Sequence, residues 1–340
     1  MNRRPAPTRR VPQFLAAATL VLASLALVAC GEKSEDGTDA GAEPFSLTLD
    51  FYPNPDHAGI YMAQKLGYFA DAGLDVSIQT PSDPAAPIKQ VAAGRTDLAI
   101  SYEPEVLLAR EQGLDVIAVG ALVDRPLTSL IWLSKSGIGG VADLRGKTIA
   151  TAGIPYQDAY LETILARAKL TPSDVDTVNV GYGLLPALVG GRAQAMLGGF
   201  RNVEGVDLRL RGLNPVVTPV DQLGVPTYDE LVLVANAAQL EEDAESVRLF
   251  LAALARGTAA AAENPAATTK ALLEANPDLD RRLTEAEVAA TLPLLSKSGL
   301  MNPAKWKAFI AWAQENGVIS VRPSTAEALS NEYLAGEIPE

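Results

Sequence analysis

The sequence predicts an α/β fold built as two similar lobes, and three patterns indicate it. Short apolar strands alternate with helical segments through residues 45–235, which is typical of mainly parallel sheets covered by helices on both faces. A segment of helix, glycine, arginine and apolar strand at 91–101 recurs at 188–198, offset by 97 residues throughout. Beyond residue 235 the pattern is helical only. We therefore expect two doubly wound lobes on one plan, with the C-terminal helices packed on the first.

In the first lobe, a strand and a helix flank the single histidine of the chain. Residues 47–51 alternate apolar and polar side chains with the period of a pleated strand. Prolines and an asparagine in 53–55 end this strand, and helical spacing begins at Ala58. His57 therefore lies in a turn at the carboxyl end of a strand, where ligands collect in open α/β sheets. The other elements expected in this lobe are strands at 74–78, 98–101 and 116–119 and helices at 84–93 and 103–108.

The second lobe repeats this alternation, and the chain then returns to the first. We expect strands at 130–133, 148–150, 178–180 and 195–198, helices at 158–168 and 184–189, and a returning strand at 231–235. The predicted domains are lobe 1 (45–130 and 225–340) and lobe 2 (131–224). The two crossings, near 126–134 and 224–232, would form a two-stranded hinge that permits closure around a small ligand.

Capping patterns and an aromatic helix face complete the C-terminal block. The spacings Thr284–Glu287 and Ser324–Glu327 predict capping boxes at two helix starts. Trp306, Phe309 and Ile310 share one helical face, which predicts core packing rather than a ligand cage.

The N-terminal segment has the features of a secretory signal. Four arginines in residues 1–10 precede 19 uncharged residues, 11–29, and the only cysteine, Cys30, follows directly. We expect residues 1–29 to be a signal peptide, Cys30 to carry lipid, and residues 30–44 to form a flexible tether without large apolar side chains. The alternative is an uncleaved membrane anchor, because 19 residues can just span a bilayer.

Composition excludes several classes of function. The 340 residues are 48 % hydrophobic and carry a net charge of −13, a poor match to nucleic acid, whose affinity comes from basic side chains. No Cys-x-x-Cys and no histidine cluster is present, so no metal site is expected. A single cysteine cannot form a disulfide within the chain. A lone histidine and the lack of Gly-x-Ser-x-Gly argue against a hydrolase.

Six segments resemble the SsuA/Thi-like solute-binding proteins of ABC transporters, the group that takes thiamine-pyrimidine precursors and alkanesulfonates. The segments are 51–57 (FYPNPDH), 63–69 (AQKLGYF), 73–76 (GLDV), 93–99 (AGRTDLA), 143–147 (DLRGK) and 198–204 (GGFRNVE). The resemblance implies a type 2 periplasmic-binding-protein fold. It also implies an exported monomer, anchored outside the cytoplasmic membrane through Cys30 or periplasmic as a lipoprotein, that delivers a small solute to a permease and its ATPase.

The same family includes the thiamine pyrimidine synthase, which makes hydroxymethylpyrimidine from its own histidine and pyridoxal phosphate with iron. His57 aligns with that histidine. The cysteine-rich iron motif of the enzyme is absent, because residues 228–232 are Tyr-Asp-Glu-Leu-Val. No lysine stands in an expected pocket loop to hold pyridoxal phosphate. We therefore expect a binding protein without cofactor and keep the synthase, with pyridoxal phosphate and iron, as the alternative.

Two sets of loops would face each other across the cleft, 52–57 and 101–104 against 152–158, 181–185 and 198–204. The ligand-binding candidates on them are Tyr52, Asn54, His57, Tyr102, Tyr156, Tyr182 and Glu204. Tyrosine offers a flat face and a hydroxyl, and the resemblance implies that Glu204 binds an aminopyrimidine edge. His57 either contacts ligand or hydrogen-bonds at the helix start. These loops are acidic, so a neutral or cationic nitrogen heterocycle is favoured, while alkanesulfonate, riboflavin and other small nutrients remain open.

Overall fold

The computed structural model describes residues 42–334. The predicted signal peptide, Cys30 and most of the predicted tether lie outside the described residues and stay predictions. The first strand begins at Glu43, so residues 43 and 44 of the expected tether are part of a sheet. Within residues 42–334 no helix has the length and apolarity needed to cross a membrane.

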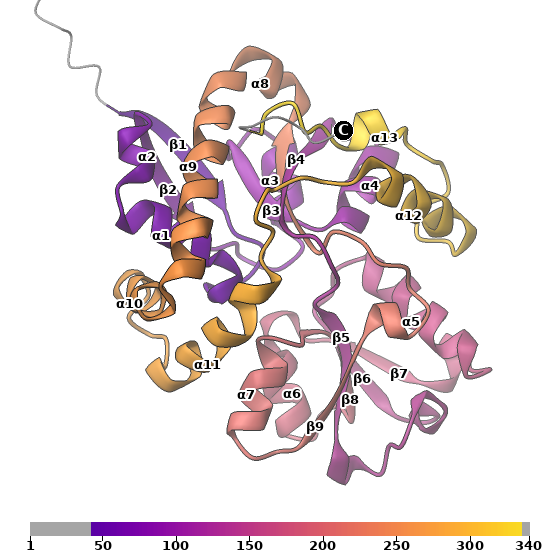
Figure 1. Cartoon of the computed structure of the whole chain (residues 1–340). Coiled ribbons are helices and arrows are strands. Elements are labelled where there is room, and N and C mark those ends of the chain that lie inside the picture. Colours follow the sequence, from indigo (N-terminus) through magenta and orange to yellow (C-terminus); the bar gives the residue numbers. More distant parts are fainter. Residues whose placement is uncertain (1–41, 335–340) are drawn as a thin grey trace, which may run out of the picture. The chain divides into compact units, whose positions relative to one another are not determined.

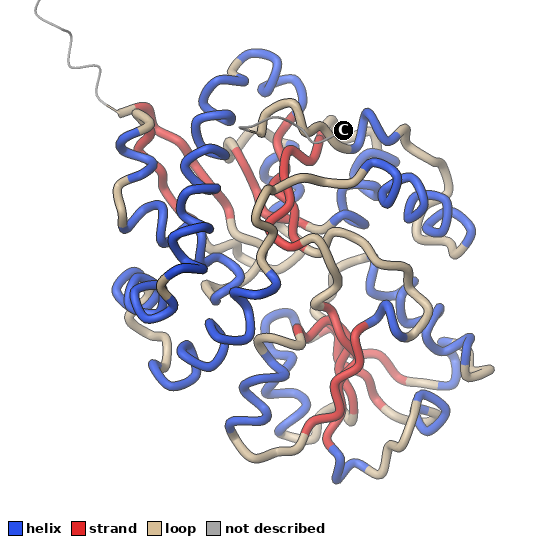
Figure 2. The backbone as a smooth tube through the Cα atoms, in the orientation of Figure 1, coloured by secondary structure: helices blue, strands red, loops and turns tan. Residues whose placement is uncertain are grey.

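Two five-stranded sheets of equivalent strand order form the two lobes (Figure 1 and Figure 2). The first sheet has the order β2-β1-β3-β10-β4 and the second β7-β6-β8-β5-β9. The strands are β1 (Glu43–Thr48), β2 (Leu74–Gln79), β3 (Leu98–Ser101), β4 (Val116–Val123), β5 (Thr128–Leu133), β6 (Thr148–Thr151), β7 (Asp176–Asn179), β8 (Ala195–Phe200), β9 (Pro215–Pro219) and β10 (Leu231–Asn236).

Each sheet is mixed, which corrects the expectation of mainly parallel sheets in one respect. Strands β1, β2 and β3 are parallel, whereas β10 runs antiparallel to both β3 and β4. The second sheet repeats this arrangement, with β5 antiparallel to β8 and β9. Strands β5 and β10 are the ones that enter from the opposite lobe. They approach from the cleft side, so they run against the strands that end there.

The sequence repeat marks equivalent positions of the two sheets. The strands of the two repeated segments are β3 and β8, and each lies third in its sheet, beside β1 and β6 respectively. The prediction that both lobes share one plan is therefore confirmed. Because the carboxyl ends of β1, β3, β6 and β8 carry the expected cleft loops, this shared order brings those loops together.

The chain crosses between the lobes at residues 124–127 and 220–230. Strand β5 begins at Thr128 in the second sheet, three residues before the boundary suggested by the sequence. Glu230 joins the two crossings, because its carboxylate accepts hydrogen bonds from the backbone N–H groups of Leu127 (2.6 Å) and Thr128 (2.7 Å). The Tyr228 hydroxyl donates to both oxygens of the same carboxylate. Burial raises the pKa of Glu230 to about 7, against the lowering effect of these donors.

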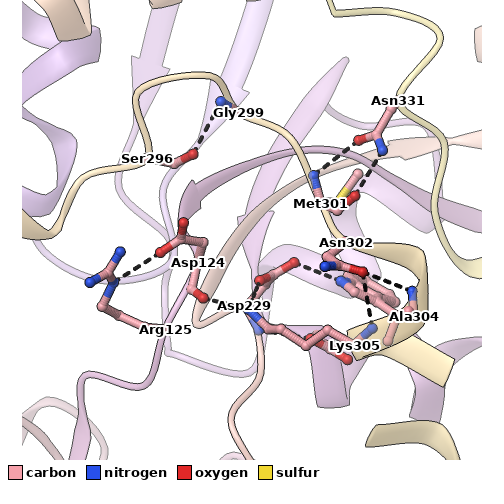
Figure 3. A network of polar contacts seen from close by, with 12 residues as sticks. Asp124, Arg125, Asp229, Ser296, Gly299, Met301, Asn302, Ala304, Lys305 and Asn331 are labelled. Atoms are coloured by element: carbon pink, nitrogen blue, oxygen red, sulfur yellow. Dashed lines mark hydrogen bonds and ion pairs between the residues drawn. The ribbon is translucent and has the colours of Figure 1, made fainter. Parts of the chain in front are cut away.

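Figure 3 shows how the C-terminal block holds both crossings. The Lys305 ammonium donates to the Asp229 carboxylate at 2.5 Å and to the backbone carbonyl of Asp124. The Trp306 indole N–H donates to the other Asp229 oxygen at 2.6 Å. One helix start therefore ties the outgoing and returning segments of the hinge to lobe 1.

Helices cover the sheets, and the long C-terminal ones pack on lobe 1 as expected. The helices are α1 (Ala58–Lys65), α2 (Tyr68–Asp71), α3 (Pro87–Ala92), α4 (Glu103–Glu111), α5 (Tyr156–Arg167), α6 (Leu184–Val189), α7 (Glu204–Leu210), α8 (Ala237–Glu242), α9 (Ala244–Glu263), α10 (Pro265–Ala275), α11 (Arg281–Thr291), α12 (Pro303–Glu315) and α13 (Thr325–Ala328).

The capping predictions had different outcomes. The capping box at Ser324 is confirmed, because its hydroxyl and the Glu327 carboxylate satisfy each other's backbone N–H groups. The box at Thr284 is wrong. Helix α11 already starts at Arg281 with Asp280 as its N-cap, so Thr284 lies inside the first turn. The core prediction for Trp306, Phe309 and Ile310 is confirmed, since all three are buried.

Candidate ligand-binding site

A pocket lies between the lobes at the carboxyl ends of β1, β3, β6 and β8. Its empty volume is about 380 Å³, counting the space at its mouth. The lining residues are Asp50, Phe51, Asn54, Tyr102, Ala152, Ile154, Tyr156, Gly198, Phe200, Val203 and Glu204. Asp50 to Asn54 and Tyr102 come from lobe 1, and the others come from lobe 2. The pocket thus requires both lobes, as the predicted facing loops imply.

Asp50 is the acidic centre of the lobe 1 wall, and two side chains hold it. His57 Nε2 donates to Asp50 Oδ1 at 2.8 Å, and the Tyr102 hydroxyl donates to Oδ2 at 2.9 Å. His57 Nδ1 accepts the backbone N–H of Asn54 at 3.2 Å. Because Nδ1 accepts a hydrogen bond, the ring proton is on Nε2 and the imidazole is neutral. Asp50 is only 1 % exposed, and neither of the two side chains that donate to it is a cation.

Glu204 provides a second carboxylate, from the wall of lobe 2. It starts α7 and accepts the backbone N–H of Phe200 at 2.7 Å. The Tyr52 hydroxyl of lobe 1 lies 3.4 Å from its other oxygen. Burial raises the pKa of Glu204, and these donors oppose that rise only in part. Glu204 lines the pocket, so its carboxylate can accept hydrogen bonds from a ligand there.

Aromatic rings form the flat walls of the pocket. Tyr102 of lobe 1 and Tyr156 of lobe 2 meet across the pocket, with ring centroids 5.6 Å apart and ring planes inclined at 58°. Tyr156 also packs on Tyr160, so its ring is supported from behind. Phe51 and Phe200 add apolar surface. Such walls suit a flat ring held by a few polar groups at its edges.

Four of the seven predicted residues line the pocket: Asn54, Tyr102, Tyr156 and Glu204. Whether they contact a ligand stays a prediction. The side chain of Asn54 is already engaged inside its turn. Its Oδ1 accepts the Asp56 N–H at 2.8 Å, and its Nδ2 donates to the Tyr52 carbonyl at 3.1 Å.

The other three, Tyr52, His57 and Tyr182, do not line the pocket. His57 is fully buried behind Asp50 and forms the hydrogen bond of the helix start, the second of its two expected roles. Tyr182 packs edge-on against Phe51 at 4.6 Å, and its hydroxyl donates to the Pro81 carbonyl at 2.8 Å. Tyr52 lies against Phe51 and reaches the pocket only through Glu204.

Known protein families and relatives match this chain over most of its length. The NMT1/THI5-like family model matches residues 54–286, more than half of the chain. This chain belongs to the NMT1/THI5-like family. A relative from Haemophilus influenzae, named as a thiamine biosynthesis protein, is 36 % identical over 279 residues, which are 82 % of this chain and 88 % of the relative. The formylaminopyrimidine-binding protein of Halalkalibacterium halodurans is 35 % identical over 303 residues, 86 % of this chain and 91 % of that protein.

In its fold, this NMT1/THI5-like protein is similar to solved structures of two-lobed binding proteins. The alkanesulfonate-binding protein SsuA of Xanthomonas axonopodis pv. citri, bound to MOPS, matches with a TM-score of 0.68 at 18 % identity, covering 86 % of this chain and 99 % of that one. At this identity the likeness concerns the fold. The predicted fold class, an α/β type 2 periplasmic-binding-protein fold of two lobes, is confirmed.

Sequence reasoning missed several pocket residues of this family member. They are Asp50, Phe51, Ala152, Ile154, Gly198, Phe200 and Val203. The structure shows why residue 198 is glycine, because its φ of +108° favours glycine and a Cβ there would lie 2.3 Å from Gln157 Nε2. The Gln157 side chain also accepts the Ala152 N–H at 3.0 Å. Gly198 thus lets the two neighbouring walls of lobe 2 approach each other.

The two lobes also touch outside the pocket. Asn202 Nδ2, in lobe 2, donates to Asp56 Oδ1 and to Thr291 Oγ1 of lobe 1, both at 2.8 Å. Burial raises the pKa of Asp56 far above its usual range. Beside this contact, Glu287 of α11 is buried and faces Glu204, Asp56 and other acids, and burial followed by their repulsion raises its pKa to about 9.

The chemistry of the lining residues limits what the pocket can hold. None of them is lysine, arginine, histidine or cysteine. Among residues 42–334, no group of three or more acidic, histidine or cysteine side chains is arranged to hold a metal ion. The residues that are present suit hydrogen bonding and stacking.

Proposed function

We propose that this protein is the exported solute-binding lipoprotein of an ABC importer and captures an aminopyrimidine precursor of thiamine between its lobes. The observation that carries the proposal is the interlobe pocket, with a tyrosine ring and a carboxylate on each wall. An aminopyrimidine is flat and presents N–H donors along its edge, so it complements both features. The similarity to a formylaminopyrimidine-binding protein supports the same ligand class.

The partners follow from this role. A permease and its ATPase would receive the ligand, and lipid on Cys30 would hold the protein at the membrane. The test is fractionation of cells expressing the full chain or its Cys30→Ala variant. We expect the full chain in the membrane fraction and the variant released, whereas equal membrane retention would favour the uncleaved anchor.

An alkanesulfonate is disfavoured as ligand by the charge of the pocket. A sulfonate needs free N–H donors and positive charge. Two carboxylates and no basic side chain line this pocket. The backbone N–H of Phe200, a lining residue, already donates to Glu204.

The synthase alternative conflicts with the position of His57. A histidine that is consumed as a reactant must meet its co-substrate, whereas His57 is fully buried with both ring nitrogens hydrogen-bonded to the protein. No lysine lines the pocket to hold pyridoxal phosphate. Residues 228–230, which align with the iron motif of the synthase, are occupied with hinge contacts. Iron and pyridoxal phosphate therefore do not fit the residues present.

The deciding experiment is a thermal-shift panel on the purified protein. Because a ligand that binds only the folded state stabilises it by about 2.7 kcal/mol at 100 times its Kd, we expect a clear rise in melting temperature with 4-amino-5-hydroxymethyl-2-methylpyrimidine or its formylaminomethyl analogue. Riboflavin and an alkanesulfonate serve as comparisons. A shift with the sulfonate alone would overturn the proposal.

A parallel reaction separates binding from synthesis. The protein is incubated with iron and pyridoxal phosphate, and the peptide that contains His57 is weighed by mass spectrometry. We expect an intact histidine. Loss of its ring together with pyrimidine formation would establish the synthase.

A further inference from the structure

The pocket places two buried carboxylates on opposite walls without a matching cation. Asp50 is 1 % exposed and Glu204 is 7 % exposed. Asp50 follows β1 in lobe 1 and Glu204 starts α7 in lobe 2, and both line the same cavity. A buried charge is costly unless it is paired and hydrogen-bonded. The pocket lining therefore supplies two carboxylates and no basic side chain to meet them.

The surroundings of Asp50 do not remove this excess. Its two donors, His57 and Tyr102, are both uncharged, since the imidazole accepts a hydrogen bond at Nδ1. Glu105 of α4 lies close to Asp50 and Tyr102, and Lys89 of α3 is the nearby cation that acts on Glu105. These hydrogen bonds hold the Asp50 carboxylate in place but do not neutralise it. A cation that neutralises it would have to bind from the pocket.

The groups facing Glu204 are acidic or neutral as well. Asp207 of α7, Glu287 of α11 and Tyr52 face it, and Asp56 of the turn before α1 faces Glu287. Arg211 is bound to Asp207 through two hydrogen bonds, at 2.5 and 2.7 Å. Arg201, next to Phe200, does not line the pocket. The positive charge that would balance Asp50 and Glu204 must therefore come with the ligand.

We propose, building on the proposed function, that the ligand is bound as a cation, with one proton added to its heterocycle on binding. The proton comes from solution to a ring nitrogen, and the resulting amidinium edge donates to Glu204 in parallel hydrogen bonds. Asp50, on the opposite wall, is a second carboxylate that stabilises the positive charge of the ligand. Apart from this N–H bond, no covalent bond forms or breaks. Asp50 is thus a specificity residue, which favours protonatable heterocycles and disfavours phosphorylated or sulfonated ones.

The test is the Kd of 4-amino-5-hydroxymethyl-2-methylpyrimidine, measured by calorimetry between pH 7 and 8.5. If the complex holds one proton more than its separated parts, Kd rises tenfold per pH unit, about 30-fold across this window. The pKa of Glu287, about 9, keeps that group mostly protonated throughout. Glu105 and Glu230 have pKa values of about 7, so they titrate near the lower end of this pH window. They do so in every variant, so the comparison between variants excludes their contribution.

Three variants isolate the effect. In Glu204→Gln the tenfold-per-unit slope should disappear, because an amide cannot carry the countercharge. In Asp50→Asn the slope should remain while Kd rises about tenfold at every pH, and the phosphate ester of the ligand should gain affinity relative to wild type. Asp207→Asn, three residues along α7 and outside the pocket, is the matched control and should keep both slope and Kd within about threefold.

A second readout on the wild-type protein avoids dependence on how the variants fold. Calorimetry in two buffers of different ionisation enthalpy gives the number of protons taken up, and we expect nearly one per ligand at pH 8.5. Binding with no proton uptake and a flat pH profile would overturn the inference and leave the proposed function standing. Failure to bind any aminopyrimidine at any pH would overturn the proposed function itself.

Discussion

Asn202 and Asp56 are hydrogen-bonded across the gap between the lobes, at 2.8 Å and away from the pocket lining. The same Asn202 amide donates to Thr291, so one side chain of lobe 2 contacts two separate elements of lobe 1. The loop that carries Asn202 joins β8 to Glu204 of the pocket wall. Its contact is therefore suited to hold the lobes together when ligand is bound.

The first prediction concerns this contact. Asn202→Ala removes two hydrogen bonds that bridge the lobes, each worth about 0.5–1.5 kcal/mol. We expect ligand affinity to fall about 5- to 150-fold, mostly through faster dissociation, and the radius of gyration from small-angle scattering to increase. Asn316→Ala is the control, because Asn316 bonds only to Trp312 of its own helix. Unchanged affinity in Asn202→Ala would show that the contact has no role in closure.

The second prediction is a pH effect centred on Glu287. Its folded pKa of about 9 exceeds the usual value of 4.5, so the folded state binds more protons and the free energy of unfolding falls as pH rises between these values. Glu287→Gln removes this loss. From pH 5 to pH 8 we expect the variant to gain roughly 2–4 kcal/mol relative to wild type in urea unfolding. Glu285→Gln, exposed on the same helix, should show no such gain.

Much of the fold could be predicted because the signals are local. Strand alternation, glycine stops and the repeated segment identify β3 and β8 as equivalent strands, and the shared strand order follows. Antiparallel pairing of β5 and β10 could not be seen, because strand direction depends on which lobe the chain comes from. The wrong capping prediction at Thr284 has a similar cause, because a local spacing pattern does not show where a helix begins. Its spacing to Glu287 fits a capping box, but Asp280, four residues earlier, caps the helix instead.

The sequence predicted which loops form the site more successfully than which side chains line it. The facing loops do meet, since their places at strand ends follow from the fold. Side-chain direction does not follow from residue type, so His57 and Tyr182 turn away from the pocket to satisfy their own polar groups. Asp50 was missed because a polar residue in an alternating segment is expected to face water, whereas Asp50 lies just beyond the end of β1 and lines the pocket with 1 % exposure.

The third prediction concerns the close packing of helices α1 and α9 within lobe 1. A Cβ on Gly257 would lie 2.2 Å from the Gly59 carbonyl oxygen, so Gly257→Ala must push the helices apart. We expect a loss of about 1–3 kcal/mol in the free energy of unfolding, measured by urea titration. Gly140→Ala is the control, because nothing lies within 4 Å of a Cβ there and its φ of −174° is extended backbone. Because replacing glycine by alanine lowers the entropy of the unfolded chain and so stabilises, equal losses in both variants would point to backbone strain rather than to the contact between the helices.

The fourth prediction concerns the hinge clamp formed by Lys305. Its ammonium balances Asp229, which is 1 % exposed, and also binds the carbonyl of Asp124 on the other crossing. Lys305→Met leaves the Asp229 charge buried with only the Trp306 donor and its backbone surroundings. Because breaking one side of a buried pair costs more than the pair contributes, we expect a loss of about 2–4 kcal/mol in the free energy of unfolding. Lys307→Met, exposed on the same helix, is the matched control.

A double variant shows whether the Lys305 effect comes from charge. In Lys305→Met with Asp229→Asn, the amide can still accept from the Trp306 indole but no charge is left unpaired. We expect it to recover at least half of the lost stability, with a coupling energy of about 1–3 kcal/mol. If the double variant is as unstable as the sum of the single ones, the contribution of Lys305 lies in its alkyl packing and its bond to Asp124. The two crossings would then be joined mainly through Glu230, which binds Leu127 and Thr128 independently of α12.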